Sequence, residues 1–190
     1  MRTDTMTGEA RATLGFALFE TALGTCGIAW GPGGVVGVQL PEREASETRR
    51  RLLRRFPDAR EVAPLSDVQQ TMDGISALLR GEATDLSSAV LDMEQVPTFN
   101  RRVYEVARTI PRGSTLTYGE IAARLGERQL AREVGQALGQ NPFAIVVPCH
   151  RVLAAGNKPG GFSANGGVVT KLKMLAIEGA VVNHTPSLFD

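Results

Sequence analysis

The chain of 190 residues has few of the residues from which disulfides and metal sites are built. Its two cysteines, Cys26 and Cys149, lie far apart in the sequence, which excludes a disulfide framework. Because only two histidines accompany them, we predict no metal site. No apolar run approaches the roughly 20 residues that a membrane-spanning helix needs, and the first residues do not resemble a secretory signal. We therefore expect a cytoplasmic protein that does not bind membranes.

The composition that remains is that of a folded protein. Hydrophobic residues make up 43% of the chain and charged residues 22%, and the formal net charge is +1, which excludes a disordered chain. The charges are unevenly distributed. Residues 1–96 hold 10 Arg or Lys against 14 Asp or Glu, whereas residues 97–190 hold 11 against 6. This asymmetry favours contact with a polyanion through the second half only.

The first half has the pattern of a sheet followed by helices. Two helices are predicted, at Ser46–Phe56 and Ser66–Leu79, the second begun by a capping box from Ser66 to Gln69. Short β-favouring runs, separated by Gly and Pro turn signals, predict three strands before them, at Thr13–Glu20, Thr25–Trp30 and Val35–Leu40.

A polar stretch, Glu82–Val96, is predicted to link two domains. We place an N-terminal supporting domain in residues 1–90 and a second domain in residues 97–184. The predicted fold class is therefore α/β in the broad α+β sense, with a mainly antiparallel sheet in the first domain and mostly helices in the second.

The helices of the second domain carry recognisable start and stop signals. Thr98 is expected to cap the first of them. Thr117 and Glu120 have the spacing of a capping box, and the short helix that they begin is expected to end at Gly126. Another short helix follows within a few residues and ends before Asn141. Two short helices joined by a tight turn containing glycine are typical of a helix-turn-helix.

The outer face of the second of these short helices carries small residues where a reader of DNA bases would carry long ones. Arg132, Gly135, Gln136 and Gly139 fall on one stripe, and each interior glycine costs about 1 kcal/mol relative to alanine. Such a face lets the helix backbone come close to another surface, such as the minor groove of DNA. A tight helix–helix contact inside the protein would explain the stripe as well.

Cys149 lies among groups that favour its thiolate. An apolar run, Phe143–Val147, is predicted as a buried strand that leads into Pro148-Cys149-His150-Arg151. A cysteine beside His and Arg is a candidate nucleophile. A buried structural cysteine is the equally plausible alternative. A glycine-rich loop, residues 156–167, follows, and such loops bring backbone amides close to a ligand.

Glu178 is predicted to lie in the last turn of a helix over Thr170–Glu178. A carboxylate is disfavoured there by the helix dipole, so it calls for a partner. His150 is the obvious candidate, and a solvated surface Glu is the alternative.

These residues together resemble one family, the O6-alkylguanine-DNA alkyltransferases (methylated-DNA–protein-cysteine methyltransferases). The resemblance rests on five motifs in order over residues 97–182, and it covers the first half only loosely. The motifs are Thr117-Tyr118-Gly119-Glu120-Ile121-Ala122, Arg132-Glu133-Val134-Gly135, Asn141-Pro142, Pro148-Cys149-His150-Arg151-Val152 and Leu175-Ala176-Ile177-Glu178-Gly179.

The resemblance implies a DNA repair enzyme that acts once and needs no cofactor. Its partner would be double-stranded DNA bearing O6-alkylguanine, contacted in the minor groove with the damaged base flipped out. The alkyl group would pass irreversibly to Cys149. O4-alkylthymine as a second substrate and cooperative binding along DNA stay open. We expect a monomer of the bacterial cytosol and nucleoid, with a ribonuclease H-like first domain.

The resemblance also implies a role for each site residue. His150, through a water molecule, would take the proton of Cys149, and Glu178 would orient that His. Asn141 would hold the hinge between recognition helix and active site. Tyr118 would donate to N3 of the departing guanine. Further DNA contacts would come from Arg132, which fills the gap in the base stack, Gly135, Gln136 and Arg151; the base pocket would be lined by Val152, Phe162 and Ser163.

Two departures from the family pattern concern the loop after Cys149. Gly161–Gly167 is about two residues longer than usual, and Phe162 stands where Tyr is common. Two other functions stay open on the sequence. A non-catalytic sensor of alkylated DNA that recruits other repair factors would need no thiol. A cysteine hydrolase would use Cys149 and His150, although adjacent residues of an extended chain point in opposite directions.

Overall fold

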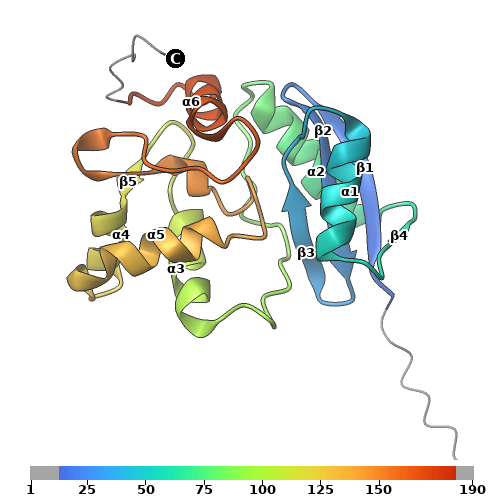
Figure 1. The fold of residues 1–190 in the computed structure, drawn as a ribbon, viewed down its shortest axis with the longest axis horizontal. Coiled ribbons are helices and arrows are strands. Elements are labelled where there is room, and N and C mark those ends of the chain that lie inside the picture. Colours follow the sequence, from blue (N-terminus) through green and yellow to red (C-terminus); the bar gives the residue numbers. More distant parts are fainter. Residues whose placement is uncertain (1–12, 183–190) are drawn as a thin grey trace, which may run out of the picture.

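The first half of the chain builds a four-stranded sheet in the computed structural model, which describes residues 13–182 (Figure 1). The strand order is β3-β2-β1-β4, antiparallel among the first three, with β4 parallel to β1. Tight turns join the first three strands, and the strand after each turn begins at a glycine of positive φ, Gly24 or Gly34. The strands are β1 (Gly15–Thr21), β2 (Gly24–Gly31), β3 (Gly34–Gln39) and β4 (Arg60–Glu61).

Helices cover both faces of this sheet (Figure 1). Side chains alternate across a strand, so Ile28 and Ala29 of β2 face opposite sides. Ala29 packs in one cluster with Leu52 of α1 (Ala45–Arg55). Ile28 packs in the larger cluster, which contains Ile75 of α2 (Ser66–Leu79).

The three predicted strands and two predicted helices of this half are confirmed, but the capping box predicted at Ser66 is wrong. Ser66 is the first helical residue of α2, Leu65 precedes it as the cap, and no side chain caps the helix. The ends of the predicted domains, residues 1–12 and 183–184, lie outside the described residues.

The predicted linker packs closely against both halves. Val35 of β3 exchanges backbone hydrogen bonds with Val90 and Asp92 at 2.9 and 2.8 Å. Arg108, the last residue of α3 (Thr98–Arg108), donates to three carbonyls of the linker. The larger hydrophobic cluster also runs without a break from α2 and β3 into α3 and α5. The two halves of the chain therefore share one core.

The second half is mostly helical, as predicted. Thr98 is the first residue of α3 and not its cap, because Pro97 holds the cap position without a side-chain bond. The capping box of Thr117 and Glu120 is confirmed, with reciprocal bonds of 3.1 and 2.6 Å. The elements are α3, β5 (Leu116–Thr117), α4 (Tyr118–Arg124), η1 (Arg128–Leu130), α5 (Ala131–Gly139), η2 (Cys149–Arg151), β6 (Val152–Leu153), η3 (Ala155–Asn157) and α6 (Gly167–Ile177).

The buried strand predicted at Phe143–Val147 is wrong, although its burial is confirmed at Phe143, Ile145, Val146 and Val147. This segment folds into a tight turn, in which Ile145 has a φ of +73° and the N–H of Val147 bonds the carbonyl of Phe143 at 2.8 Å. The Asn141 side chain supplies partners at both ends of the turn, which satisfies its buried polar groups without a sheet.

Replacing Thr117 with Ala is expected to lower the free energy of unfolding by about 1 kcal/mol, because the backbone N–H of Glu120 loses its acceptor. Thr98→Ala is the matched control, since Thr98 is exposed and caps nothing; a change below about 0.5 kcal/mol is expected. Urea unfolding of both variants measures the difference, and equal losses would contradict the capping assignment.

Candidate active site

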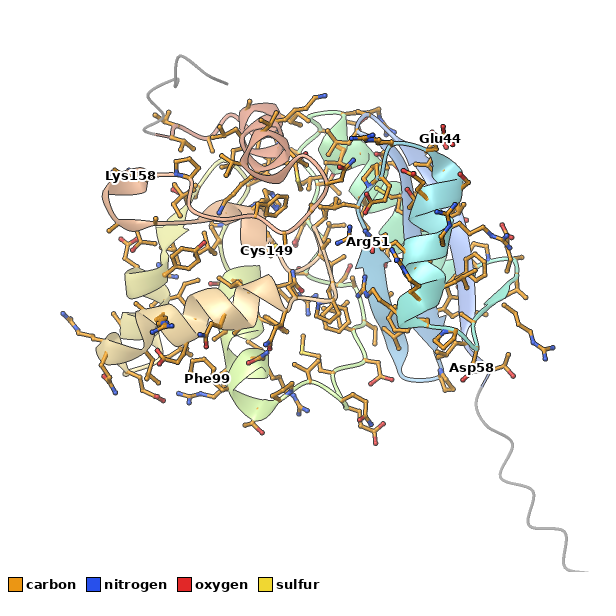
Figure 2. All side chains as sticks on the ribbon, viewed as in Figure 1. Glu44, Arg51, Asp58, Phe99, Cys149 and Lys158 are labelled. Carbon is orange, nitrogen blue, oxygen red and sulfur yellow. The ribbon has the colours of Figure 1, made fainter. Side chains whose placement is uncertain are left out.

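Cys149 lies at the start of the short helix η2, between α5 and α6 in the view of Figure 2. Its backbone N–H bonds the carbonyl of Val147 at 2.8 Å, so the turn before it fixes its position. The side chain is half-buried, whereas Cys26 is fully buried in β2. The thiol borders a cleft of about 520 Å³, which opens along α5. Phe162 and Ser163, which the family resemblance assigns to the base pocket, line this cleft.

His150 and Arg151 meet one carboxylate behind Cys149. The predicted pairing of His150 with Glu178 is confirmed, with 2.8 Å between Nε2 and Oε1, and the solvated-surface alternative is wrong because Glu178 is buried. Arg151 grips the same carboxylate with Nε and Nη2, each at 2.9 Å, and donates to the Ile110 carbonyl at 2.7 Å. The DNA contact predicted for Arg151 is therefore corrected, since its guanidinium is turned inward and engaged.

The pairing of Glu178 with Arg151 and His150 sets the protonation of the His150 ring. Burial raises the pKa of Glu178, but the hydrogen bonds and charges of His150 and Arg151 outweigh burial and bring the pKa to about 2. An ionised carboxylate only accepts hydrogen bonds, so Nε2 of His150 carries the proton. Burial lowers the pKa of His150 in spite of Glu178. The ring is thus neutral near pH 7, and its buried Nδ1, which has no protein partner among residues 13–182, is the basic nitrogen.

Asn141 closes the turn that precedes Cys149. Its Nδ2 donates to the Val147 carbonyl and its Oδ1 accepts from the Phe143 N–H, both at 2.9 Å. Burial raises the pKa of Cys149, while the Asn141 side chain and the charge of Lys171 lower it. One amide therefore fixes the position of the thiol and favours its thiolate.

Lys171 is a site residue that sequence reasoning missed. Its ammonium is buried and donates to the carbonyls of Val152 at 2.6 Å and Gly161 at 3.4 Å, and it lies 5.9 Å from the centre of the Tyr118 ring. Burial lowers the pKa of Lys171 to about 8, although the charge of Cys149 opposes this. The available signal was its spacing, because Lys171 precedes Glu178 by two helical turns and shares its face.

Val152 lies behind the cleft rather than on its wall. The side chain is fully buried, and the carbonyl accepts a hydrogen bond from Nζ of Lys171. The lining predicted for Val152 is therefore corrected. Its place in the short parallel pair with Leu116 explains the burial.

The glycine-bearing face of α5 is open to solvent. Arg132, Gln136 and Gly139 are exposed, and Arg132, Gly135 and Gly139 line the same cleft as Cys149. A Cβ added at Gly139 would meet nothing within 4 Å. The alternative of a tight internal helix contact is therefore wrong. Tyr118 stands beside this face, since a Cβ at Gly135 would lie 3.8 Å from its ring.

The described residues contain no group of three or more His, Cys, Asp or Glu side chains arranged to hold a metal ion. Within the same residues, no helix is both long and apolar enough to cross a membrane.

Comparison with known proteins gives the family. Residues 98–180 match the model of the 6-O-methylguanine DNA methyltransferase, DNA binding domain. The methylated-DNA–protein-cysteine methyltransferase of Methanothermobacter thermautotrophicus is 36% identical over 153 residues, which are 80% of this chain and 78% of that protein. This chain belongs to the methylated-DNA–protein-cysteine methyltransferase family. The methyltransferase of Mycolicibacterium paratuberculosis is 43% identical over 122 residues, or 63% of this chain and 70% of that one.

The similarity to a solved structure extends over nearly the whole of both chains. The O6-methylguanine methyltransferase of Mycobacterium tuberculosis superposes with a TM-score of 0.70 at 29% identity, over 93% of this chain and 99% of that one. The OGT of Mycobacterium tuberculosis, solved in complex with DNA, superposes with a TM-score of 0.68 at 31% identity, over 87% of this chain and 92% of that one. The predicted mixed fold, with an antiparallel sheet followed by helices, is confirmed.

Replacing Glu178 with Gln is expected to cost about 3 kcal/mol of the free energy of unfolding near neutral pH, because the buried Arg151 cation loses its counter-charge and the neutral His150 ring loses a charged acceptor. The pKa of Glu178 is depressed in the folded state, so its contribution is complete above the usual carboxyl pKa of about 4.5 and is lost as pH falls through about 2. Urea unfolding should show that the difference in the free energy of unfolding between wild type and Glu178→Gln shrinks as the pH falls from 7 to 2. Glu61→Gln, at an exposed ion pair, is the control. A pH-independent difference would contradict this account.

Replacing Lys171 with Met is expected to slow the reaction of Cys149 with iodoacetamide at pH 7 about threefold, because the thiolate loses a nearby positive charge. Peptide mapping separates this reaction from that of Cys26, whose pKa burial raises to about 12. Lys173→Met, on the exposed side of the same helix, should leave the rate unchanged. Equal rates in the two variants would show that Lys171 does not act on the thiol.

Proposed function

We propose that this protein repairs duplex DNA by moving an alkyl group from O6 of guanine to the sulfur of Cys149, once per molecule. The bond between the alkyl carbon and O6 breaks, and the carbon–sulfur bond of a thioether forms. The guanine leaves with the electron pair of the broken bond and regains a proton. The observation that carries the proposal is a half-buried thiol at the edge of a 520 Å³ cleft, backed by a His–Glu pair.

The His–Glu pair provides the route by which the thiol loses its proton. Glu178 fixes Nε2–H of His150, which leaves Nδ1 as the base. A water molecule between Nδ1 and Sγ of Cys149 would carry the proton, and the imidazolium that forms would be stabilised by the ionised Glu178. The relay matters because burial raises the pKa of Cys149 and so opposes spontaneous ionisation.

Tyr118 is placed to donate a hydrogen bond to the leaving group. It lines the cleft with Cys149, and burial and the charge of Cys149 raise the pKa of its phenol, so it keeps its proton until transfer begins. Donation from this hydroxyl to N3 of the guanine would stabilise the negative charge that develops on the departing base.

The open face of α5 is the proposed DNA-binding surface. Its glycines permit the helix backbone to approach the floor of the minor groove. Arg132 is exposed at the mouth of the cleft, where its side chain can take the place of the flipped base. Gln136 would contact the groove beside it. A Mycobacterium tuberculosis relative that has been solved in complex with DNA supports DNA as the partner.

The protein would act as a monomer in the cytosol and nucleoid, without a cofactor. A thioether is chemically stable, so the alkylated protein would not regain its thiol. Each molecule therefore repairs one lesion, and the rate constant of interest is that of a single turnover.

Incubation with a duplex oligonucleotide containing one O6-methylguanine tests the proposal. Intact mass should rise by one methyl group, saturating at one per protein, and peptide mapping should place the methyl group on Cys149. Cys149→Ala should bind the same DNA and gain no mass. Retained binding to the lesion without a mass change in the wild type would make the protein a sensor of alkylated DNA and would remove the transferase assignment.

A further inference from the structure

The N-terminal half reaches the turn before Cys149 through one carbonyl group. The carbonyl of Pro142 accepts from the backbone N–H of Val38 at 2.8 Å and from Nη2 of Arg55 at 3.0 Å. Arg55 ends α1 and lies 87 residues from Pro142 in the sequence. Val38 also forms a parallel bridge with Phe143. Two donors from the sheet domain thus converge on the first peptide of the turn.

Arg55 is held in place for this contact by its own domain. Its guanidinium lies over the ring of Phe56, 5.1 Å from the centre, and Nη1 contacts the Gln39 side-chain oxygen at 3.3 Å. The absence of a side chain at Gly37 makes the arrangement possible, because a Cβ there would approach the Phe56 ring to 2.5 Å and Nη2 of Arg55 to 3.0 Å. Contacts within the first half of the chain therefore orient the Arg55 guanidinium toward Pro142.

The restrained carbonyl belongs to the same turn that positions the thiol. Asn141, next to Pro142, closes the turn onto Val147, and the Val147 carbonyl accepts from the N–H of Cys149. A small cavity of about 80 Å³ lies where the two halves meet, bounded by Arg55 on one side and by Asn141 and Cys149 on the other.

We propose that Arg55 is a positioning residue for alkyl transfer, acting by holding the Pro142 carbonyl so that the Asn141–Val147 turn keeps Cys149 in its reactive place. The inference rests on the proposed function. It gives the N-terminal half a part in the chemical step, although that half supplies none of the reacting groups.

A pair of neighbouring arginines allows a matched test. Arg54 and Arg55 both lie in the last turn of α1, so either replacement removes one positive charge from the same helix end. Arg55→Ala is expected to lower the saturating rate of methyl transfer from an O6-methylguanine duplex about tenfold relative to Arg54→Ala, with an unchanged Kd for the DNA. Arg55→Lys, which keeps a positively charged hydrogen-bond donor at this position, should recover about a third of the wild-type rate.

The thiol itself reports positioning without DNA. When the turn loosens, Asn141 supports the thiolate less, so the pH profile of iodoacetamide reaction at Cys149 should move upward by about half a unit in Arg55→Ala and stay fixed in Arg54→Ala. The other titratable groups near this thiol are His150 on η2, Lys171 on α6, Tyr118 on α4 and Tyr104 on α3, and both variants retain them.

Two outcomes would overturn the proposal: an Arg55→Ala transfer rate equal to that of Arg54→Ala, or a slower rate with an unshifted thiol profile. If Arg55→Ala does not fold, Arg55→Lys against Arg54→Lys carries the same test, with about a threefold difference expected. A wild type that transfers no methyl group would overturn the proposed function. The thiol profile would still decide whether Arg55 positions Cys149.

Discussion

The site depends on the hydrogen bonds and the ion pair that the ionised carboxylate of Glu178 forms with His150 and Arg151. The carboxylate sits at the end of α6, where the helix dipole is unfavourable, and is held there by two side chains from η2. A buried charge is tolerable only when it is paired and hydrogen-bonded, and three bonds within 2.9 Å meet that condition. The same contacts fix the tautomer of His150, so the structural anchor and the choice of base are one arrangement.

The turn that carries Cys149 is fixed from several sides by elements distant in sequence. Helix α6 reaches it through Glu178, and Lys171 ties the following strand to the active-site loop. The sheet domain reaches it through Pro142. A short irregular segment has little stability of its own, so a reactive group on it is precise only when such contacts over-determine its geometry.

Local sequence signals predicted the elements of this protein better than its long-range contacts. The Thr117 box was predictable because both partners lie within four residues, whereas the similar pattern at Ser66 fails because the chain enters α2 from Leu65. The apolar run after Asn141 was read correctly as buried but not as a turn, because periodicity does not distinguish the two in so short a segment. Cys149, His150 and Glu178 stood out chemically. The sequence did not indicate that the Arg151 side chain points inward. It did not indicate a role for Arg55 either, because the contact of Arg55 with Pro142 depends on the tertiary fold.

The packed linker and shared core bear on how separable the two halves are. The matched family domain covers only residues 98–180. However, β3 donates a backbone hydrogen bond to the carbonyl of Pro142, and Arg108 donates to carbonyls of the linker. Expressing that domain alone would expose the side of the turn that Val38 now covers. It would also remove the linker carbonyls to which Arg108, at the end of α3, donates. For protein engineering, the boundary between the halves is thus a packed interface, and a shortened version would need a new polar surface designed along it.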